Sequence, residues 1–98
     1  MFATIRRYQV KPGSTADVGQ RVQQGLIPLL AKQAGFVSYH ALDAGNDVAV
    51  SVSLYQDRAA AEAANKTAAS WVQVNLSGLI GNAEVTVGEV IAQSVKKE

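Results

Sequence analysis

The chain has 98 residues, of which 48% are apolar and 17% are charged, and its net charge is +1. A chain of this length forms one domain, and about a third of the surface of the unfolded chain stays exposed after folding. A typical domain is about a quarter charged. The shortage of charges therefore favours burial of some surface between subunits, and a compact monomer with a small apolar patch is the alternative.

Composition also excludes several classes of function. The nine Lys and Arg residues are scattered, so no basic stripe suited to nucleic acid forms. The lack of cysteine excludes disulfides, thiolate nucleophiles and zinc-thiolate sites, and it fits a cytoplasmic protein. With one histidine and scattered acids, no protein-bound metal is expected. Neither a signal peptide nor a stretch of about 18 apolar residues is found, so we expect no membrane association.

Residues 2–10 alternate in character and are predicted to form the first strand. Because adjacent side chains on a strand point to opposite faces, Arg6 and Arg7 lie on different sides of the sheet. One of them must point toward buried groups. It either pairs with a carboxylate such as Glu84 or Glu89, extends past a strand end, or binds an anionic ligand.

A helix is predicted to follow, with one apolar stripe at three- and four-residue spacing. Ser14 and Asp17 resemble a capping box, in which Ser14 caps the helix and Asp17 reaches back to its first turn. Pro28 lies inside this helix and predicts a kink, because proline lacks the N–H of the helical hydrogen bond. Gly35 is expected to end the segment in a left-handed conformation.

Residues 35–55 are predicted to form a hairpin of two strands. Gly45 and Asn46 suit a two-residue turn of the mirror-image kind, since glycine adopts positive φ without steric cost. That turn places Tyr39 opposite Val52, and both are expected to face the helices. The other face of the sheet is expected to carry Phe36, His40, Leu42 and Tyr55.

Asp57 is predicted to cap a second helix whose apolar face consists mainly of alanine. Small side chains let this helix approach the sheet, while Trp71 near its far end is expected to hold the helix away and open a gap beside the ring. Residues 84–92 are predicted to form the last strand, in which Gly88 weakens the pairing or marks a bulge.

The predicted order is strand, helix, strand, strand, helix, strand. Right-handed crossovers give a ferredoxin-like α+β fold, with an antiparallel sheet in the order 4-1-3-2 and both helices on one side. We expect a single domain over residues 1–93 and a polar tail over residues 94–98. Because nothing in the chain covers the other sheet face, we expect a homodimer formed through it.

Four segments, residues 10–13, 35–39, 48–57 and 87–90, make the chain resemble the antibiotic biosynthesis monooxygenase family. The resemblance implies a dimeric α/β barrel, in which two sheets pack together and each subunit has a cavity between sheet and helices. Members of the family oxidise aromatic polyketide intermediates with molecular oxygen and no cofactor, or break down haem. Others isomerise small acids, and many have no assigned activity.

The cofactor-free oxygenases of the family depend on an asparagine, a tryptophan and a tyrosine in the cavity. The resemblance therefore implies Trp71, Tyr39 and Asn65 as catalytic candidates, although the six-residue spacing from Asn65 to Trp71 places them about 240° apart around a helix. Haem degradation is disfavoured, because the one histidine, His40, lies on a strand rather than on the second helix.

Each candidate also has a structural interpretation. Trp71 either fills the core or forms a ligand-contacting wall, and the hydroxyl of Tyr39 either makes a structural hydrogen bond or contacts substrate. His40 is either an interface residue or a general base. The expected ligand-binding residues are Arg6, Arg7 and Val52.

Two functions are therefore compatible with the sequence. The first is a cofactor-independent monooxygenase for an electron-rich phenolic or polyketide-like molecule, which the protein would hold as an anion in a dry pocket. The second is a non-enzymatic dimeric protein that binds a small molecule or acts as a scaffold. A cavity smaller than about 300 Å³ would favour the second.

Overall fold

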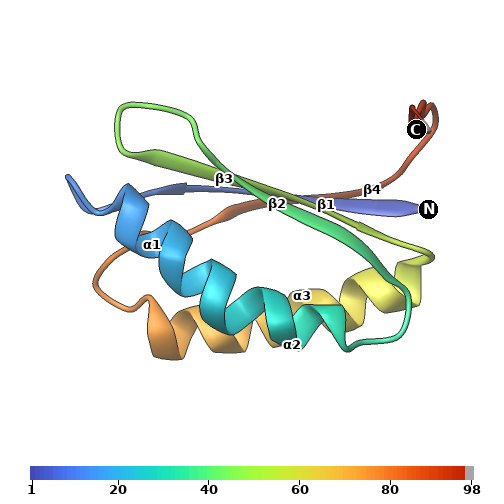
Figure 1. Ribbon diagram of the computed structural model, residues 1–98, viewed down its shortest axis with the longest axis horizontal. Coiled ribbons are helices and arrows are strands. Elements are labelled where there is room, and N and C mark those ends of the chain that lie inside the picture. Colours follow the sequence, from blue (N-terminus) through green and yellow to red (C-terminus); the bar gives the residue numbers. More distant parts are fainter. Residues whose placement is uncertain (97–98) are drawn as a thin grey trace.

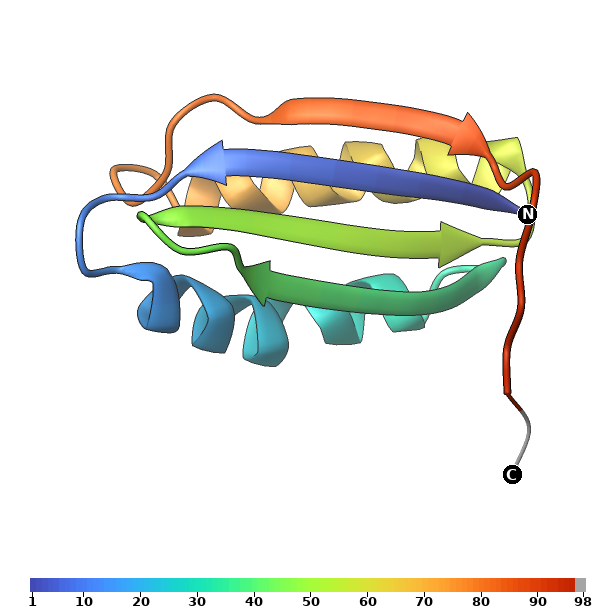
Figure 2. The ribbon, with the colours of Figure 1, turned by 90° about the horizontal axis from the view of Figure 1, so that it is seen from above.

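The computed structural model describes residues 1–96, and its four strands form one antiparallel sheet in the order β2-β3-β1-β4. This is the predicted 4-1-3-2 order read from the other edge (Figure 2). All helices cover the same face of the sheet (Figure 1). The elements are β1 (Phe2–Gln9), α1 (Thr15–Arg21), a π-helical turn (Val22–Leu26), α2 (Ile27–Ala31), β2 (Phe36–Asp43), β3 (Val48–Tyr55), α3 (Arg58–Asn75) and β4 (Glu84–Glu89).

The first helix is continuous but changes its winding before Pro28. Proline has no N–H to donate to the carbonyl of Gln24, and the chain widens into the π-helical turn Val22–Leu26 immediately before α2. The predicted irregularity near Pro28 is therefore present as a change of winding within a continuous helix. Gly35 then ends the segment with φ of +82°, also as predicted.

The two helix starts differ in their capping. Ser14 precedes α1, but its side chain makes no capping hydrogen bond, and Asp17 instead accepts a hydrogen bond from Nε of Arg21 at 3.2 Å. The predicted capping box is therefore wrong. Asp57 caps α3 as predicted, because its Oδ1 accepts a hydrogen bond from the backbone N–H of Ala60 at 2.8 Å.

The hairpin between β2 and β3 has a longer turn than predicted. Residues 45–47 all have positive φ, at 83°, 53° and 59°, so the turn takes three residues instead of two. A shift of one residue moves every side chain of one strand to the other face. Tyr39 consequently lies opposite the buried Ser53, and Val52 lies opposite His40 on the face without helices.

The prediction that Phe36 and Tyr55 lie on this open face is therefore wrong. The two residues are partners across β2 and β3, Tyr55 is buried, and their rings meet edge to face at 6.2 Å between centroids. An irregularity between Phe36 and Ser38 keeps both Phe36 and Tyr39 on the helix side. His40 and Leu42 do lie on the open face, as expected.

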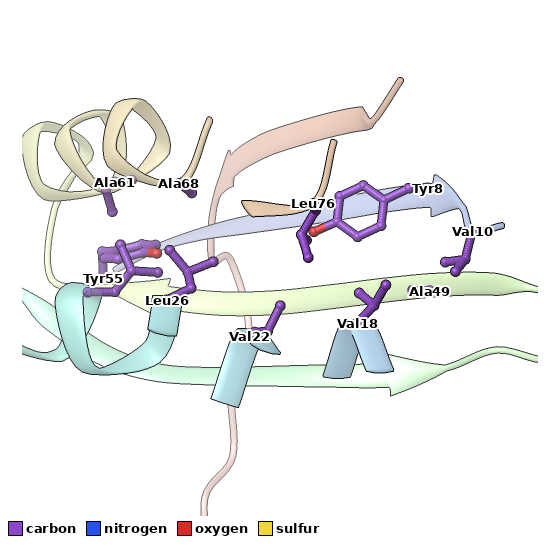
Figure 3. Packing of buried hydrophobic residues seen from close by; sticks show 12 residues of the cluster. Tyr8, Val10, Val18, Val22, Leu26, Ala49, Tyr55, Ala61, Ala68 and Leu76 are labelled. Carbon is purple, nitrogen blue, oxygen red and sulfur yellow. The ribbon is translucent and has the colours of Figure 1, made fainter. Parts of the chain in front are cut away.

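The core occupies the single layer between helices and sheet. Val18, Val22 and Leu26 extend from the first helix toward the strands (Figure 3). Alanines of α3, including the buried Ala61 and Ala68, leave room for close approach of that helix.

The last strand pairs with β1 without interruption. Gly88 lies opposite Ala3 in regular register, so it marks no bulge. β4 ends at Glu89, before the predicted end at residue 92. The predicted polar tail, residues 94–98, extends beyond the described residues at positions 97–98. Within the described chain, the helices are too short or too polar to span a membrane.

Candidate functional site

A cavity of about 260 Å³ lies between α1 and the covered face of the sheet, near the turn that joins β2 and β3. The buried Val18 and Val22 form part of its helical wall, together with Gly19. The strands contribute Tyr8 from β1, Tyr39 from β2, and Ala49 and Ser51 from β3. The cavity therefore combines apolar walls with four hydroxyl groups, those of Tyr8, Thr15, Tyr39 and Ser51, and Asp43 also borders it. Apolar walls with a few polar groups are typical of small-molecule sites.

Tyr39 keeps its phenolic proton at neutral pH. Burial, with a smaller contribution from Tyr8, raises the pKa of Tyr39 from 10.0 to about 12, although hydrogen bonding with Ser51 and the charge of Arg6 act in the opposite direction. A phenol with so high a pKa is a hydrogen-bond donor and not a base. Tyr39 can therefore donate to an oxygen atom of a ligand in the cavity.

Arg6 is the arginine that points toward the helices, and it is only 8% exposed. It lies opposite Ser51, and its Nη2 donates a hydrogen bond to the backbone carbonyl of Asn65 on α3 at 3.2 Å. A buried guanidinium without a carboxylate is costly, because desolvation of the charge is not offset by a counter-charge. Arg6 does not line the cavity, but its pairing register places it beside Ser51, which does.

The carboxylates proposed as partners of Arg6 do not pair with it. Glu84 and Glu89 belong to the exposed β4, and the salt bridge found within residues 1–96 joins Arg21 to Asp17. Arg7 lies on the open face and is exposed, so it does not contribute to the cavity. Of the two arginines considered, the structure brings only Arg6 near the site.

Trp71 lies away from the cavity. Its ring packs on Gly25 of the π-helical turn and borders a separate surface hollow with Arg21, Gln24 and Asn75. The predicted gap between helix and sheet beside the tryptophan is therefore wrong, because the ring contacts the neighbouring helix instead.

Asn65 and Val52 also lie outside the cavity lining. Asn65 contributes its backbone carbonyl to Arg6. Val52 belongs to the open face, where it pairs with Ile5 and His40. Of the three catalytic candidates, the structure places Tyr39 alone in the cavity.

Tyr8 and Ser51 are lining residues that the sequence analysis did not propose for the site. Tyr8 lies on the same face of β1 as Arg6, so the alternation of residues 2–10 could have identified it once Arg6 was placed inside. The predicted turn placed Val52 toward the helices and therefore its neighbour Ser51 on the opposite face. Within residues 1–96, no group of three or more His, Asp or Glu residues is arranged to hold a metal ion.

The strand order defines the chain as a ferredoxin-like α+β domain, with a cavity under one face of its sheet. The model of the antibiotic biosynthesis monooxygenase family matches residues 1–70, so the chain belongs to this family. None of the curated proteins matches the chain.

Solved structures share the fold at low sequence identity. A protein of unknown function from Nitrosomonas europaea is 21% identical, with a TM-score of 0.81 over 99% of this chain and 95% of that one. SnoaB, a cofactor-independent oxygenase from Streptomyces nogalater, is 19% identical, with a TM-score of 0.71 over 94% of each chain. The heme-degrader MhuD from Mycobacterium tuberculosis is 15% identical, with a TM-score of 0.76 over 97% of this chain and 100% of that one.

Proposed function

We propose that the protein is a cofactor-independent monooxygenase that acts on a small phenolic molecule. The observation that carries the proposal is the cavity itself, which Tyr39 and Ser51 line close to the buried charge of Arg6. We expect such a pocket to stabilise a phenolate, because Tyr39 offers a neutral donor, Arg6 offers a nearby positive charge and the apolar walls limit contact with water. The likeness to SnoaB, a cofactor-independent oxygenase, supports the same chemistry.

The phenolate is the reductant in this reaction. It transfers one electron to O₂, and the resulting phenoxyl radical and superoxide combine at the ring carbon para to the oxygen. Uptake of a proton gives a hydroperoxide, which loses water and leaves a quinone. Overall, one phenol and one O₂ give one para-quinone and one water. Tyr39 acts by donating a hydrogen bond to the electron-rich anion, and the nearby charge of Arg6 stabilises that anion.

The size of the cavity selects for one ring. At about 260 Å³ it lies below the volume of about 300 Å³ that we expected for a bicyclic ligand. A phenol with a single ring in this cavity and an unsubstituted para carbon is therefore the substrate class that we propose.

Oxygen uptake with 2,6-dimethoxyphenol tests this function. We expect consumption above the buffer rate and, with labelled O₂, one labelled oxygen atom in the quinone. Loss of a single preorganised donor typically lowers a rate by about 100-fold or more, so Tyr39→Phe is expected to lower the rate by at least about tenfold while the fold is retained. Uptake by the native protein equal to that of buffer would contradict the proposal.

A non-enzymatic small-molecule-binding or scaffold protein is the second candidate. It is favoured by the small cavity volume and by the position of Trp71 and Asn65 outside that cavity. Their catalytic roles stay predictions from the family resemblance. Saturable binding of 2,6-dimethoxyphenol without oxygen uptake would identify this second function.

We also propose that the protein forms a homodimer through the open sheet face. Ile5 and Leu42 are 42% and 51% exposed there, and Val52 lies between their strands. A second copy offers a matching surface, since a twofold axis brings the same apolar patch of both subunits together.

A further inference from the structure

The cavity adjoins a second hollow along the outer edge of β2. This outer groove has a volume of about 390 Å³ and lies between the edge strand and the first helix. Three residues line the groove but not the inner cavity, namely Gln23, Ile27 and His40. The residues that border both hollows are Gly19, Val22, Tyr39, Ala41 and Leu42.

Gly19 lies at the junction of the two hollows. It belongs to α1, on the same helical face as Val22 and Gln23, which are three and four residues further on. A Cβ atom built at Gly19 would have no heavy atom within 4 Å. Glycine inside a helix lowers the stability of the folded state by about 0.5–1 kcal/mol relative to alanine. At position 19 no neighbouring atom requires a glycine. Its missing side chain leaves the space between cavity and groove open.

We infer that the ligand of this protein is elongated, with its ring in the inner cavity and a polar extension that passes Gly19 into the outer groove. The inference rests on the proposed function for the position of the ring. It extends that function, because it adds a second part to the substrate and assigns Gly19 as a specificity-determining residue.

The lining of the groove indicates the chemistry of the extension. None of the described residues that line it is Asp, Glu, Lys or Arg, so a charged extension would lack a counter-charge. The side-chain amide of Gln23 offers both a donor and an acceptor. β2 is an edge strand, and within residues 1–96 one side of its backbone pairs with no other strand. A neutral amide or hydroxyl group would therefore find partners in this groove.

Binding of two probes tests the inference without turnover. The probes are 3-methylphenol, which fills only the inner cavity, and 3-(3-hydroxyphenyl)propanamide, which adds a neutral amide; both leave the para carbon unsubstituted. Under nitrogen, calorimetric titration is expected to give at least about tenfold tighter binding of the amide probe. Gly19→Val is expected to remove this difference, so that the two probes bind the variant with equal affinity.

Two further variants separate a blocked passage from damage to the helix. Gln20→Val places the same β-branched side chain at an exposed neighbouring position, and this variant should still bind the amide probe more tightly than the simple phenol. Gln23→Leu keeps the passage open but removes the amide partner. It should weaken binding of the amide probe and leave binding of the simple phenol unchanged. Gly19→Ala replaces Gly19→Val if the larger residue impairs folding, and it should lower the difference between the probes partially.

The outcomes distinguish the two proposals. If native protein binds both probes with equal affinity, or if Gly19→Val and Gln20→Val behave alike, the elongated ligand is contradicted and the inner cavity still stands as the site. If native protein binds neither probe, the cavity is not a phenol site, and the proposed function fails together with the inference.

Discussion

Trp71 rests directly on Gly25. A Cβ atom built at Gly25 would lie 2.7 Å from Cζ2 of Trp71, closer than real Cβ contacts allow. The ring of Trp71 on α3 thus fixes the position of the π-helical turn in the first helix. Gly25→Ala should therefore destabilise the protein by about 1 kcal/mol, because overpacking costs about 1–3 kcal/mol and the gain in helix propensity returns about 0.5–1 kcal/mol. Urea unfolding measures this change.

Gly19→Ala is the matched control for that experiment. The added methyl group there meets no atom within 4 Å, so the helix gains stability by about 0.5–1 kcal/mol. Combining Gly25→Ala with Trp71→Phe should remove most of the penalty, since the smaller ring leaves room for the methyl group. Equal stabilities of Gly25→Ala and Gly19→Ala would show that Trp71 does not constrain Gly25.

Periodicity was sufficient to predict the topology of this chain. Strand and helix periods, together with the breaks at Pro28 and Gly35, predicted the order of elements and the sheet. The register of the hairpin was predicted wrongly, because Asn46 and Asp47 both adopt the left-handed conformation. A two-residue and a three-residue turn are both compatible with the sequence here, and the difference exchanges the faces of β3.

The candidate site was predictable only in part. The alternation of β1 required one buried arginine, but alternation alone could not show whether Arg6 or Arg7 faces the helices. Tyr39 was placed correctly, because the register error exchanged the faces of β3 and left residues 39–42 of β2 on their predicted faces. The position of Trp71 depends on the π-helical turn, which brings Gly25 beneath the ring. Such a change of winding has no periodic signal in the sequence.

Alkaline pH should destabilise the protein through Tyr39. Its pKa is about 12 in the folded state, against 10.0 for an exposed tyrosine. The folded state therefore holds the proton more tightly, and stability is full below pH 10 and decreases as the pH rises toward 12. Two pKa units correspond to up to about 2.7 kcal/mol. Urea unfolding at pH 9 and pH 11 should show a smaller decrease for Tyr39→Phe than for native protein.

An absorbance titration provides an independent check on Tyr39. The tyrosinate signal of the native protein should include a component that appears only near pH 12, and this component should be absent from Tyr39→Phe. Tyr55→Phe is the control, since burial also raises the pKa of Tyr55, but the component due to Tyr39 should remain in that variant. If Tyr39→Phe leaves the late component unchanged, its assignment to Tyr39 is wrong.

The charge of Arg6 should stabilise a bound phenolate. An opposite charge nearby typically lowers the pKa of an acid by about 1–3 units, so 4-nitrophenol bound to native protein should ionise at lower pH than when bound to Arg6→Met. An optical titration of the bound dye measures the difference, and we expect about one unit. Arg7→Met is the matched control, because Arg7 lies on the open face. Equal values in native protein and Arg6→Met would exclude Arg6 as the source of the potential.

A lysine in the open sheet face should prevent dimer formation. Val52 pairs with Ile5 and His40 near the middle of that face, and burial of an unpaired lysine between two sheets is costly. Light scattering should give twice the mass of one chain for native protein and the mass of a single chain for Val52→Lys. Ala69→Lys adds the same charge at an exposed position of α3 and should stay dimeric. A native protein that is monomeric at micromolar concentration, or a Val52→Lys variant that keeps the double mass, would contradict an interface through this face.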